Sequence, residues 1–417
     1  MSKYLSILSK MIQQETISYE NDKEVTKFLE FHQILEEKFP KIHKSLEKIN
    51  LDGSLLFKWQ PASKPKNSLL LMNHMDTAPI TGEWECDGLS GEIKDNYMYG
   101  RGTLDTKGPL FAMLMAVEEL LEEGFEPNFN IYLASSRNEE IAGDGAIKIR
   151  EHLIKENVKL ETVLDEGGAI LDKPMPYVKR PIAMVGISEK GHIILQIKEI
   201  NNLAESNISL SEKIELIKKH IESQYILKGK VSKDVEQMLR GVGKEMPFPI
   251  DLVLKKSKKI EPMILKVLPK VSEEAKSIVK STINFREDKI VIKLSKHDDV
   301  NYILNSLKSI FKKYDLELEV LNQSEASNIT DINSKGYKII EKTIDSVFEN
   351  VGTSPYLMMA GTDSRHFKDV CDCILRFAPL DMKIEDLNRV HNINERININ
   401  TISNMVNFYK EYIKLYN

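Results

Sequence analysis

Three short apolar runs in this sequence are each followed by side chains that can bind a metal. The runs and the polar residues after them are 69–72 with His74 and Asp76, 129–135 with Glu139 and Glu140, and 162–164 with Asp165 and Glu166. Apolar runs this short, without polar alternation, predict strands that are buried on both faces, as in a parallel sheet. Open α/β sheets place their ligands at the carboxyl ends of such strands. The sequence therefore predicts a functional site along one edge of a sheet.

Helical patterns lie between and around these predicted strands. Apolar residues recur at helical spacing within 1–47, and a strongly apolar stretch at 110–123 ends at Gly124, which favours a left-handed helix cap. Further helices are expected at 145–153 and, at the end of the chain, at 402–416. Strands that alternate with helices predict an α/β fold, in which a mostly parallel mixed sheet is sandwiched by helices.

A different order of elements begins near residue 187. The expected elements are a strand at 191–199, a helix at 211–226, two strands within 281–294, a helix at 298–313 and a strand at 316–321. This order is the ferredoxin-like plan. We therefore expect a catalytic domain in two parts, 1–186 and 324–417, with an inserted α+β lid domain at 187–323. The Lys-rich segment 231–271 is interpreted as an insertion whose lysine pairs form a solvated face.

The composition narrows the possible partners of the chain. Its 417 residues carry a formal net charge of -5 with a pI near 6.1, so no positive excess exists to attract nucleic acid or an acidic membrane. The sequence contains no long apolar run of membrane-spanning length, and its N-terminus lacks the apolar core of a signal peptide. We expect a cytoplasmic protein without a membrane partner, and we expect its three cysteines to be buried free thiols.

The polar residues at the strand ends could together form a two-metal site. A pair of divalent metals needs a carboxylate between them, further ligands on each side, and a free carboxylate to activate water. The candidate ligands are His74, Asp105, Glu140, Glu166 and His391, with Glu139 as the free carboxylate and Asp76 as the acceptor for the second ring N–H of His74. Each group alone has an ordinary explanation, such as a helix cap for Asp105. Their repetition at successive strand ends favours the metal site.

The same residues resemble the motifs of a known family, the zinc metallopeptidases that include carboxypeptidase S, aminoacylase, glutamate carboxypeptidase and succinyl-diaminopimelate desuccinylase. The matching motifs, in family order, are His74-Met75-Asp76-Thr77, Gly100-Arg101-Gly102 followed by Asp105, Glu139-Glu140, Asp165-Glu166-Gly167-Gly168, Glu189-Lys190-Gly191, Gly361-Thr362-Asp363-Ser364-Arg365-His366 and His391-x-x-Asn394-Glu395. They extend from about residue 65 to the end of the chain, and the carboxypeptidase S branch is the most similar.

This resemblance implies two zinc ions, for which Co²⁺ or Mn²⁺ are possible substitutes. It implies that Asp105 bridges the two metals, that His74 and Glu166 bind one ion, and that Glu140 and His391 bind the other. Glu139 would be the general base and would activate a metal-bridging water. A cis peptide bond after Asp105 is also implied. Whether Asp165 or Glu166 is the ligand stays open, and Glu166 is preferred because the family's acidic ligand commonly precedes Gly or Pro.

The implied reaction is hydrolysis of an amide bond in a peptide or an N-acyl amino acid, of the carboxypeptidase, dipeptidase or aminoacylase type. Arg365 could hold the free carboxylate of such a substrate, with Gly361 and Thr362 shaping the loop around it. An ion pair of Arg365 with Asp363 or Asp369 is an equally good explanation for its presence.

The predicted lid departs from the family pattern. Residues 200–206 contain no histidine, where the family carries one that reaches a partner's active site, and His192 is expected to have a surface or packing role. The alternative function is therefore a metal-binding relative that binds peptides or amino acids with little turnover. A two-metal phosphodiesterase ranks last, because no basic phosphate clamp lies near the ligands. We expect a homodimer through the lid strand at 193–197.

Overall fold

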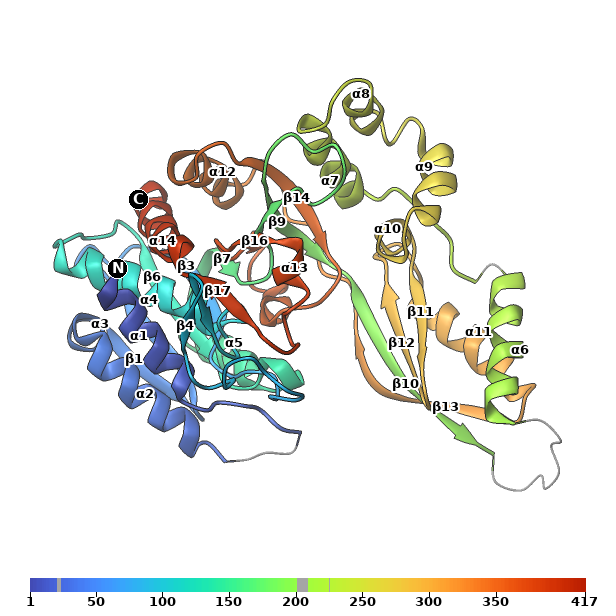
Figure 1. Ribbon diagram of the computed structural model, residues 1–417, viewed down its shortest axis with the longest axis horizontal. Coiled ribbons are helices and arrows are strands. Elements are labelled where there is room, and N and C mark those ends of the chain that lie inside the picture. Colours follow the sequence, from blue (N-terminus) through green and yellow to red (C-terminus); the bar gives the residue numbers. More distant parts are fainter. Residues whose placement is uncertain (21–23, 201–208, 225) are drawn as a thin grey trace.

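The computed structural model of the protein describes residues 1–20, 24–200, 209–224 and 226–417. Figure 1 shows a larger body that contains both termini and a smaller body joined to it by long strands. The larger body is built on a ten-stranded sheet, and the smaller body on a separate four-stranded sheet. Within the described residues, no helix is both long and apolar enough to cross a membrane.

The ten-stranded sheet mixes parallel and antiparallel strands. Its order is β1-β2-β6-β3-β7-β15-β9-β8-β16, with β14 paired to β9. The strands are β1 (Glu47–Leu51), β2 (Ser54–Trp59), β3 (Asn67–His74), β6 (Asn130–Ser136), β7 (Lys159–Asp165), β8 (Ile170–Asp172), β9 (Ile182–Glu189), β14 (Gly352–Met358), β15 (Ile374–Arg376) and β16 (Asp381–Lys383). The pairs β3–β6, β3–β7 and β7–β15 are parallel. The predicted mixed α/β fold is confirmed.

Helices cover this sheet, and a small three-stranded sheet lies beside it. The helices are α1 (Ser2–Gln13), α2 (Thr26–Lys38), α3 (Pro40–Ser45), α4 (Lys107–Glu122), α5 (Gly145–Lys155), α12 (Lys335–Val347), α13 (Ile384–Leu387) and α14 (Ile402–Tyr416). The small sheet has the order β17-β5-β4, with β4 (Ile93–Lys94), β5 (Tyr97–Tyr99) and β17 (Arg396–Asn398). Helix α4 has 13 of its 16 residues buried, because it packs between β3 and the helices α1, α3 and α14. Gly124 follows it with a φ of +72°, as the predicted helix cap requires.

The four-stranded sheet has the order β11-β12-β10-β13. Its elements are β10 (Gly191–Glu199), α6 (Leu210–Ser223), β11 (Thr282–Arg286), β12 (Lys289–Leu294), α11 (Val300–Lys312) and β13 (Leu316–Ser324), in the predicted ferredoxin-like sequence. Both helices pack on one core of isoleucines and leucines with this sheet. The expectation of a dimer through 193–197 is wrong in one respect: these residues lie in β10, which is paired with β12 on one side and β13 on the other, so this strand has no free edge.

Residues 226–281 contain four α-helices and one 3₁₀ turn, namely α7 (Lys233–Lys244), α8 (Ile250–Lys255), α9 (Glu261–Val267), the 3₁₀ turn Leu268–Lys270 and α10 (Glu273–Val279). Helix α7 packs against β14 and β9 of the ten-stranded sheet. Val235, Met238 and Leu239 are buried there in a cluster that includes Leu357 of β14. Part of the chain that the sequence assigned to the lid, 187–323, therefore lies on the larger body.

All three cysteines are buried free thiols, as predicted.

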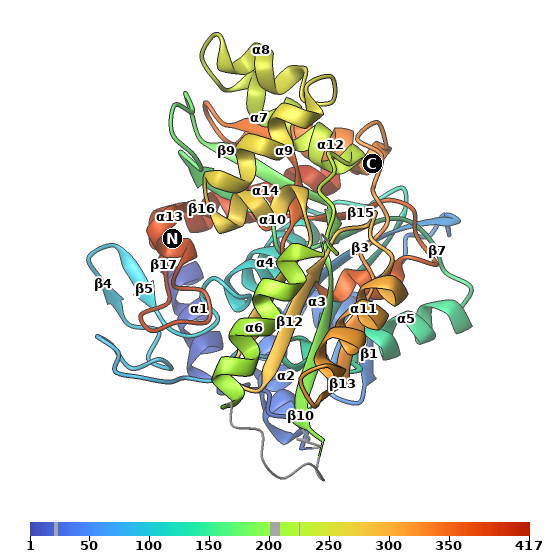
Figure 2. The same ribbon diagram turned by 90° about the vertical axis from the view of Figure 1, so that its right-hand side faces the viewer.

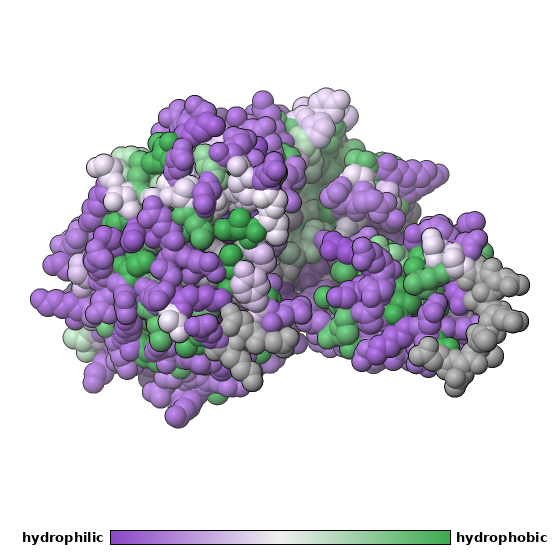
Figure 3. Space-filling view, turned by 60° about the horizontal axis from the view of Figure 1, so that its bottom comes forward, coloured by the Kyte–Doolittle hydropathy of each residue, from purple (hydrophilic) through white to green (hydrophobic). Residues whose placement is uncertain are grey.

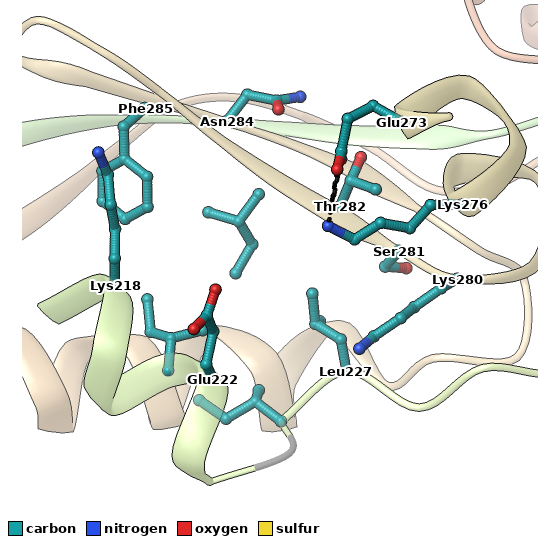
Figure 4. Close-up of a pocket in the computed structure, with 13 residues that line it drawn as sticks. Lys218, Glu222, Leu227, Glu273, Lys276, Lys280, Ser281, Thr282, Asn284 and Phe285 are labelled. Atoms are coloured by element: carbon teal, nitrogen blue, oxygen red, sulfur yellow. Dashed lines mark hydrogen bonds and ion pairs between the residues drawn. The ribbon is translucent and has the colours of Figure 1, made fainter. Parts of the chain in front are cut away.

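The smaller body contains a cavity. The cavity, of about 330 Å³, lies between α6, α10 and β11 and is shown in Figure 4. Apolar side chains such as Leu227 and Phe285 line it together with Lys218 and Lys280. None of the predicted metal ligands borders this cavity.

Candidate metal centre

The sheet order brings the predicted site residues together. Strand β3 lies between β6 and β7 and is parallel to both, so the three carboxyl ends meet at one edge of the sheet. His74 ends β3, the pair Glu139 and Glu140 follows β6 in a short 3₁₀ turn, and Glu166 follows β7. Asp105 precedes α4, and His391 comes from the loop between α13 and β17. Residues from five separate segments thus converge on one place.

Asp105 lies between two histidines. Its Oδ1 is 3.0 Å from Nε2 of His74, and its Oδ2 is 2.8 Å from Nε2 of His391. Each histidine has a second carboxylate nearby: Glu166 lies 4.0 Å from His74, and Glu140 lies 3.0 Å from His391. The atoms form two groups that could each hold a metal ion, His74–Asp105–Glu166 and Asp105–Glu140–His391, and both groups share Asp105. The Asp105–Thr106 peptide bond is cis, as the resemblance implied.

The two halves of this centre differ in their exposure. The side chain of His74 is 2% exposed, whereas that of His391 is 55% exposed. The centre is therefore closed on the side of the sheet and open on the side of His391. Figure 3 shows that the surface of the molecule is hollowed between the larger and smaller bodies.

Asp76 connects His74 to the two glutamates. Its Oδ1 lies 3.3 Å from Nδ1 of His74, whose Nδ1 is also 3.0 Å from the Asp76 carbonyl oxygen. The Asp76 carboxylate accepts hydrogen bonds of 3.1 Å from the backbone N–H groups of Glu139 and Glu140. This geometry suits a residue that orients the imidazole and also fixes the turn that carries both glutamates.

Asp165 and Glu166, the two candidates for one ligand, differ in their contacts. One oxygen of Asp165 accepts from the backbone N–H of Glu166, and the other accepts from the backbone N–H of Ser364. Asp165 is absent from both groups of possible ligands among the described residues, and Glu166 is present. Asp165 therefore braces the turn after β7, and the Glu166 carboxylate faces His74 and Asp105.

Sequence reasoning missed the role of Glu395, which is completely buried. One of its oxygens accepts hydrogen bonds from the backbone N–H groups of Gly102, Leu104 and Asp105. The other forms a 2.7 Å ion pair with Arg101. Glu395 therefore holds the turn that presents Asp105. The only signal in the sequence was that Glu395 follows His391 in a recognised motif, which did not reveal its partner 290 residues away.

Arg365 lies over Gly361 in the loop after β14. Its Nε donates to the Thr362 carbonyl oxygen at 2.9 Å, and a Cβ on Gly361 would lie 1.1 Å from the Arg365 guanidinium. Neither expected ion pair is formed within the described residues, since Asp369 pairs with Arg150 and Asp363 accepts from the Ser136 hydroxyl. The nearest carboxylate is Glu189, whose Oε2 is 3.9 Å from Arg365 Nε.

The loop that carries Arg365 is tied to the start of the smaller body. Glu189, the last residue of β9, is buried and accepts hydrogen bonds from the Thr362 backbone N–H and hydroxyl, and it also pairs with the buried Arg376. His192 of β10 lies 3.4 Å from Arg365. The predicted surface or packing role for His192 thus becomes a contact with a candidate substrate-binding residue. The region 200–206, where the family histidine was sought, falls almost entirely outside the described residues.

Charge crowding shifts the pKa values of the site residues in the metal-free protein. Burial disfavours the charged form of His74, but hydrogen bonds to Asp105 and Asp76 outweigh it and raise the pKa of His74 well above its usual value. Hydrogen bonds to Asp105 and Glu140 raise the pKa of His391 to about 11. Burial, reinforced by nearby carboxylates, raises the pKa of Glu139 well above its ordinary value. Without a metal, the histidine protons offset part of the negative charge of the acidic cluster.

These shifts predict that metal binding depends on pH. His74 and His391 are protonated in the metal-free protein at neutral pH, so a metal must displace a proton from each. We expect the apparent dissociation constant of each metal to fall roughly tenfold for each unit that the pH rises between 6 and 8. Competition with a chelator of known affinity at pH 6, 7 and 8 measures this. An affinity that is constant across the range would contradict the assignment of the two histidines as ligands.

Comparisons with known proteins agree with this geometry. Residues 70–415 match the model of peptidase family M20/M25/M40. The chain is 32% identical to the N-fatty-acyl-amino acid synthase/hydrolase PM20D1 of Xenopus tropicalis, over 96% of this chain and 83% of that protein. It is 30% identical to the probable carboxypeptidase S-like 2 of Dictyostelium discoideum, over 98% of this chain and 84% of that protein.

A solved structure supports the fold over the whole chain. The M20 family metallo-carboxypeptidase Sso-CP2 from Sulfolobus solfataricus superposes with a TM-score of 0.71, at 18% identity, over 100% of this chain and 99% of that one. The family match covers the strand ends, the turn of Asp105 and the loop of His391. The chain therefore belongs to peptidase family M20/M25/M40 and is a metal-dependent hydrolase.

Proposed function

We propose that this protein is a dizinc hydrolase that cleaves an amide bond in a peptide or an N-acyl amino acid. The observation that carries the proposal is the position of Asp105, whose two oxygens face two histidines that each have a second carboxylate beside them. One shared carboxylate with a histidine and a carboxylate on either side is the donor set of a two-metal hydrolytic site.

The residues fit zinc, with Co²⁺ or Mn²⁺ as possible substitutes. Imidazole nitrogen and carboxylate oxygen are common zinc ligands, and the ligand atoms in each group lie within 4.8 Å of one another. His74 and Glu166 would hold one ion, Glu140 and His391 the other, and Asp105 both. When bound, the two ions would lower the pKa of water and polarise the substrate carbonyl.

Glu139 is placed to handle the proton in this reaction. Its backbone is fixed by Asp76, and its carboxyl group lies within the electrostatic influence of His74, Asp105 and Glu166. In the proposed reaction Glu139 takes a proton from water and returns it to the leaving amine nitrogen. Asp76 supports this role by orienting His74 and the turn that carries Glu139.

Arg365 is the candidate for substrate recognition. Peptides at their C-terminal residue and N-acyl amino acids share one feature, a free carboxylate next to the amide that is cleaved. A guanidinium binds such a group with two parallel hydrogen bonds. The absence of an ion pair within hydrogen-bond distance among the described residues leaves Arg365 available, and Gly361 leaves room for its side chain. The relatives named for N-acyl amino acids and for carboxypeptidase activity support this substrate class.

The test of the proposal combines metal analysis with a substrate screen. Elemental analysis of the purified protein is expected to give two zinc ions per chain after zinc loading. Amine release from dipeptides and from N-acyl amino acids of different chain length is expected to stop after chelation and to return when zinc is added back. Two bound ions without turnover of any amide would favour the alternative, a metal-binding protein that binds these molecules without cleaving them.

Replacing Gly361 with alanine is predicted to weaken substrate binding. The new methyl group would collide with the Arg365 guanidinium, which must then move away. The loss of a charge-assisted contact of about 1.5–3 kcal/mol should raise KM roughly 10- to 100-fold with a smaller change in kcat. The measurement compares steady-state kinetics on an N-acyl amino acid with those on its carboxamide, because the carboxamide lacks the charge that Arg365 would bind. Equal losses on both substrates would contradict the assigned role.

A further inference from the structure

Two loops of the larger body end in aromatic side chains that point into solvent. Tyr177 is 74% exposed and Phe248 is 81% exposed, the two most exposed large apolar residues in the described part of the chain. Each has a proline beside it, and each stands outside the buried cores. Single exposed apolar side chains are ordinary, but an apolar surface that several of them share is a feature of interaction sites.

The two loops form a single surface, although 70 residues separate them. The Lys179 backbone N–H donates to the Glu245 carbonyl oxygen at 3.0 Å, and Arg180 pairs with the Glu245 carboxylate at 2.8 Å. Val178 of the first loop shares a small buried cluster with Val242 and Met246. We call the surface made by residues 173–180 and 244–259 the aromatic tip. Helix α8 adds the exposed Leu252 and Val253 to it.

The aromatic tip is strongly basic. It holds eight lysines and arginines and two acidic residues, a net charge of +6 on a chain whose total is -5. Both acids are already paired, Glu245 with Arg180 and Asp251 with Lys255, and Lys258 pairs with Glu261 just beyond the tip. The exposed Lys179, Lys244 and Lys256 have no ion pair among the described residues, so their charge is available.

The position of the tip allows it to meet a flat surface. Helix α8 lies at the top of the molecule in Figure 1 and again in Figure 2, which is turned by 90° about the vertical axis. In Figure 1 the loop before β9 rises toward the same end of the molecule and overlaps α7 in this view. Helix α8, which carries part of the tip, is therefore at an extremity of the molecule.

We propose that the aromatic tip docks the protein on an anionic lipid bilayer. Aromatic rings settle at the headgroup level of a membrane, and lysines around an apolar surface are attracted to anionic lipid. A bilayer satisfies both features at once. The whole-chain charge predicted no membrane partner, but an average over 417 residues hides a basic surface of this size. The docking surface lies outside the metal centre and is independent of the proposed reaction.

Vesicle flotation with the full-length protein tests the proposal. The protein is expected to float with vesicles of phosphatidylcholine and phosphatidylglycerol but to stay behind with pure phosphatidylcholine, and salt should reduce the bound fraction. Y177S/F248S and K179E/K256E should each weaken binding at least tenfold. The controls are Y302S, which removes an exposed aromatic ring from α11, and K312E/K313E, which makes the same charge change at the end of α11. Both controls should bind within twofold of the unmodified protein.

Several results would overturn the proposal. The first is that the protein does not float with anionic vesicles at low salt, and the second is that it floats equally well with neutral vesicles. The third is that the tip variants and the controls lose vesicle binding to the same extent. Light scattering of Y177S/F248S gives a further check, because conversion of a dimer to a monomer without vesicle binding would show that a second copy covers the tip. A blue shift of F248W fluorescence on anionic vesicles is expected, and an unchanged spectrum would also contradict docking. Circular dichroism and turnover of a soluble substrate show that the variants remain folded.

Discussion

Replacement of Glu139 by glutamine is expected to lower kcat for amide hydrolysis by roughly 10³-fold while two metal ions remain bound. Glutamine keeps the size and the hydrogen-bonding shape of the side chain but cannot accept the proton of water. General acid–base groups contribute about 10²- to 10⁴-fold to enzyme rates. The measurement is steady-state turnover on the best substrate from the screen, together with elemental analysis of the same sample.

The matched control for this variant is Glu151→Gln, which makes the same change on the exposed side of α5. It should retain full activity. Turnover of Glu139→Gln close to that of the control would remove Glu139 as the base, and Asp363, a buried carboxylate beside it, would become the next candidate. Loss of metal from Glu139→Gln would show instead that Glu139 is a ligand.

Replacement of Glu395 by glutamine is expected to lower the free energy of unfolding by about 3–5 kcal/mol, the usual cost of removing one partner from a buried ion pair. The side chain of Arg101 is 1% exposed and would keep its charge without a counter-charge. Glutamine carries no negative charge, so its hydrogen bonds with the three backbone N–H groups of the Asp105 turn would also be weaker. We expect weaker metal binding as well, because that turn positions the shared carboxylate.

Urea unfolding of the metal-free protein measures the change in the free energy of unfolding without any contribution from bound metal. Glu385→Gln is the control, since the Glu385 side chain is 62% exposed and lies 3.9 Å from Lys383. Its unfolding midpoint should stay near that of the unmodified protein. A Glu395→Gln variant as stable as this control, with unchanged metal affinity, would contradict the role assigned to Glu395.

The metal centre was predictable because its residues follow strands with a strong local pattern. The apolar runs before His74, Glu139 and Glu166 read as buried strands, and all three are buried strands of one sheet. The sequence patterns did not reveal β14, which directly precedes the Gly361 loop. That strand contains a serine and a proline and lacks a clean apolar run, yet it pairs with β9 along its whole length. Its burial comes from α7, which covers it and which lies more than 100 residues earlier in the chain.

Local patterns in the sequence predicted the strand ends, the helix α4 with its glycine cap, and the four candidate ligands around Asp105, because each depends on a motif a few residues long. The tertiary structure alone decided which other carboxylates, such as Asp165 and Glu395, hold the turns that carry those side chains. Glu395 supports Asp105 across 290 residues, and Arg180 and Glu245 join the two loops of the aromatic tip across 65. Contacts of that span leave no local pattern, because they depend on how the sheet and its helices pack.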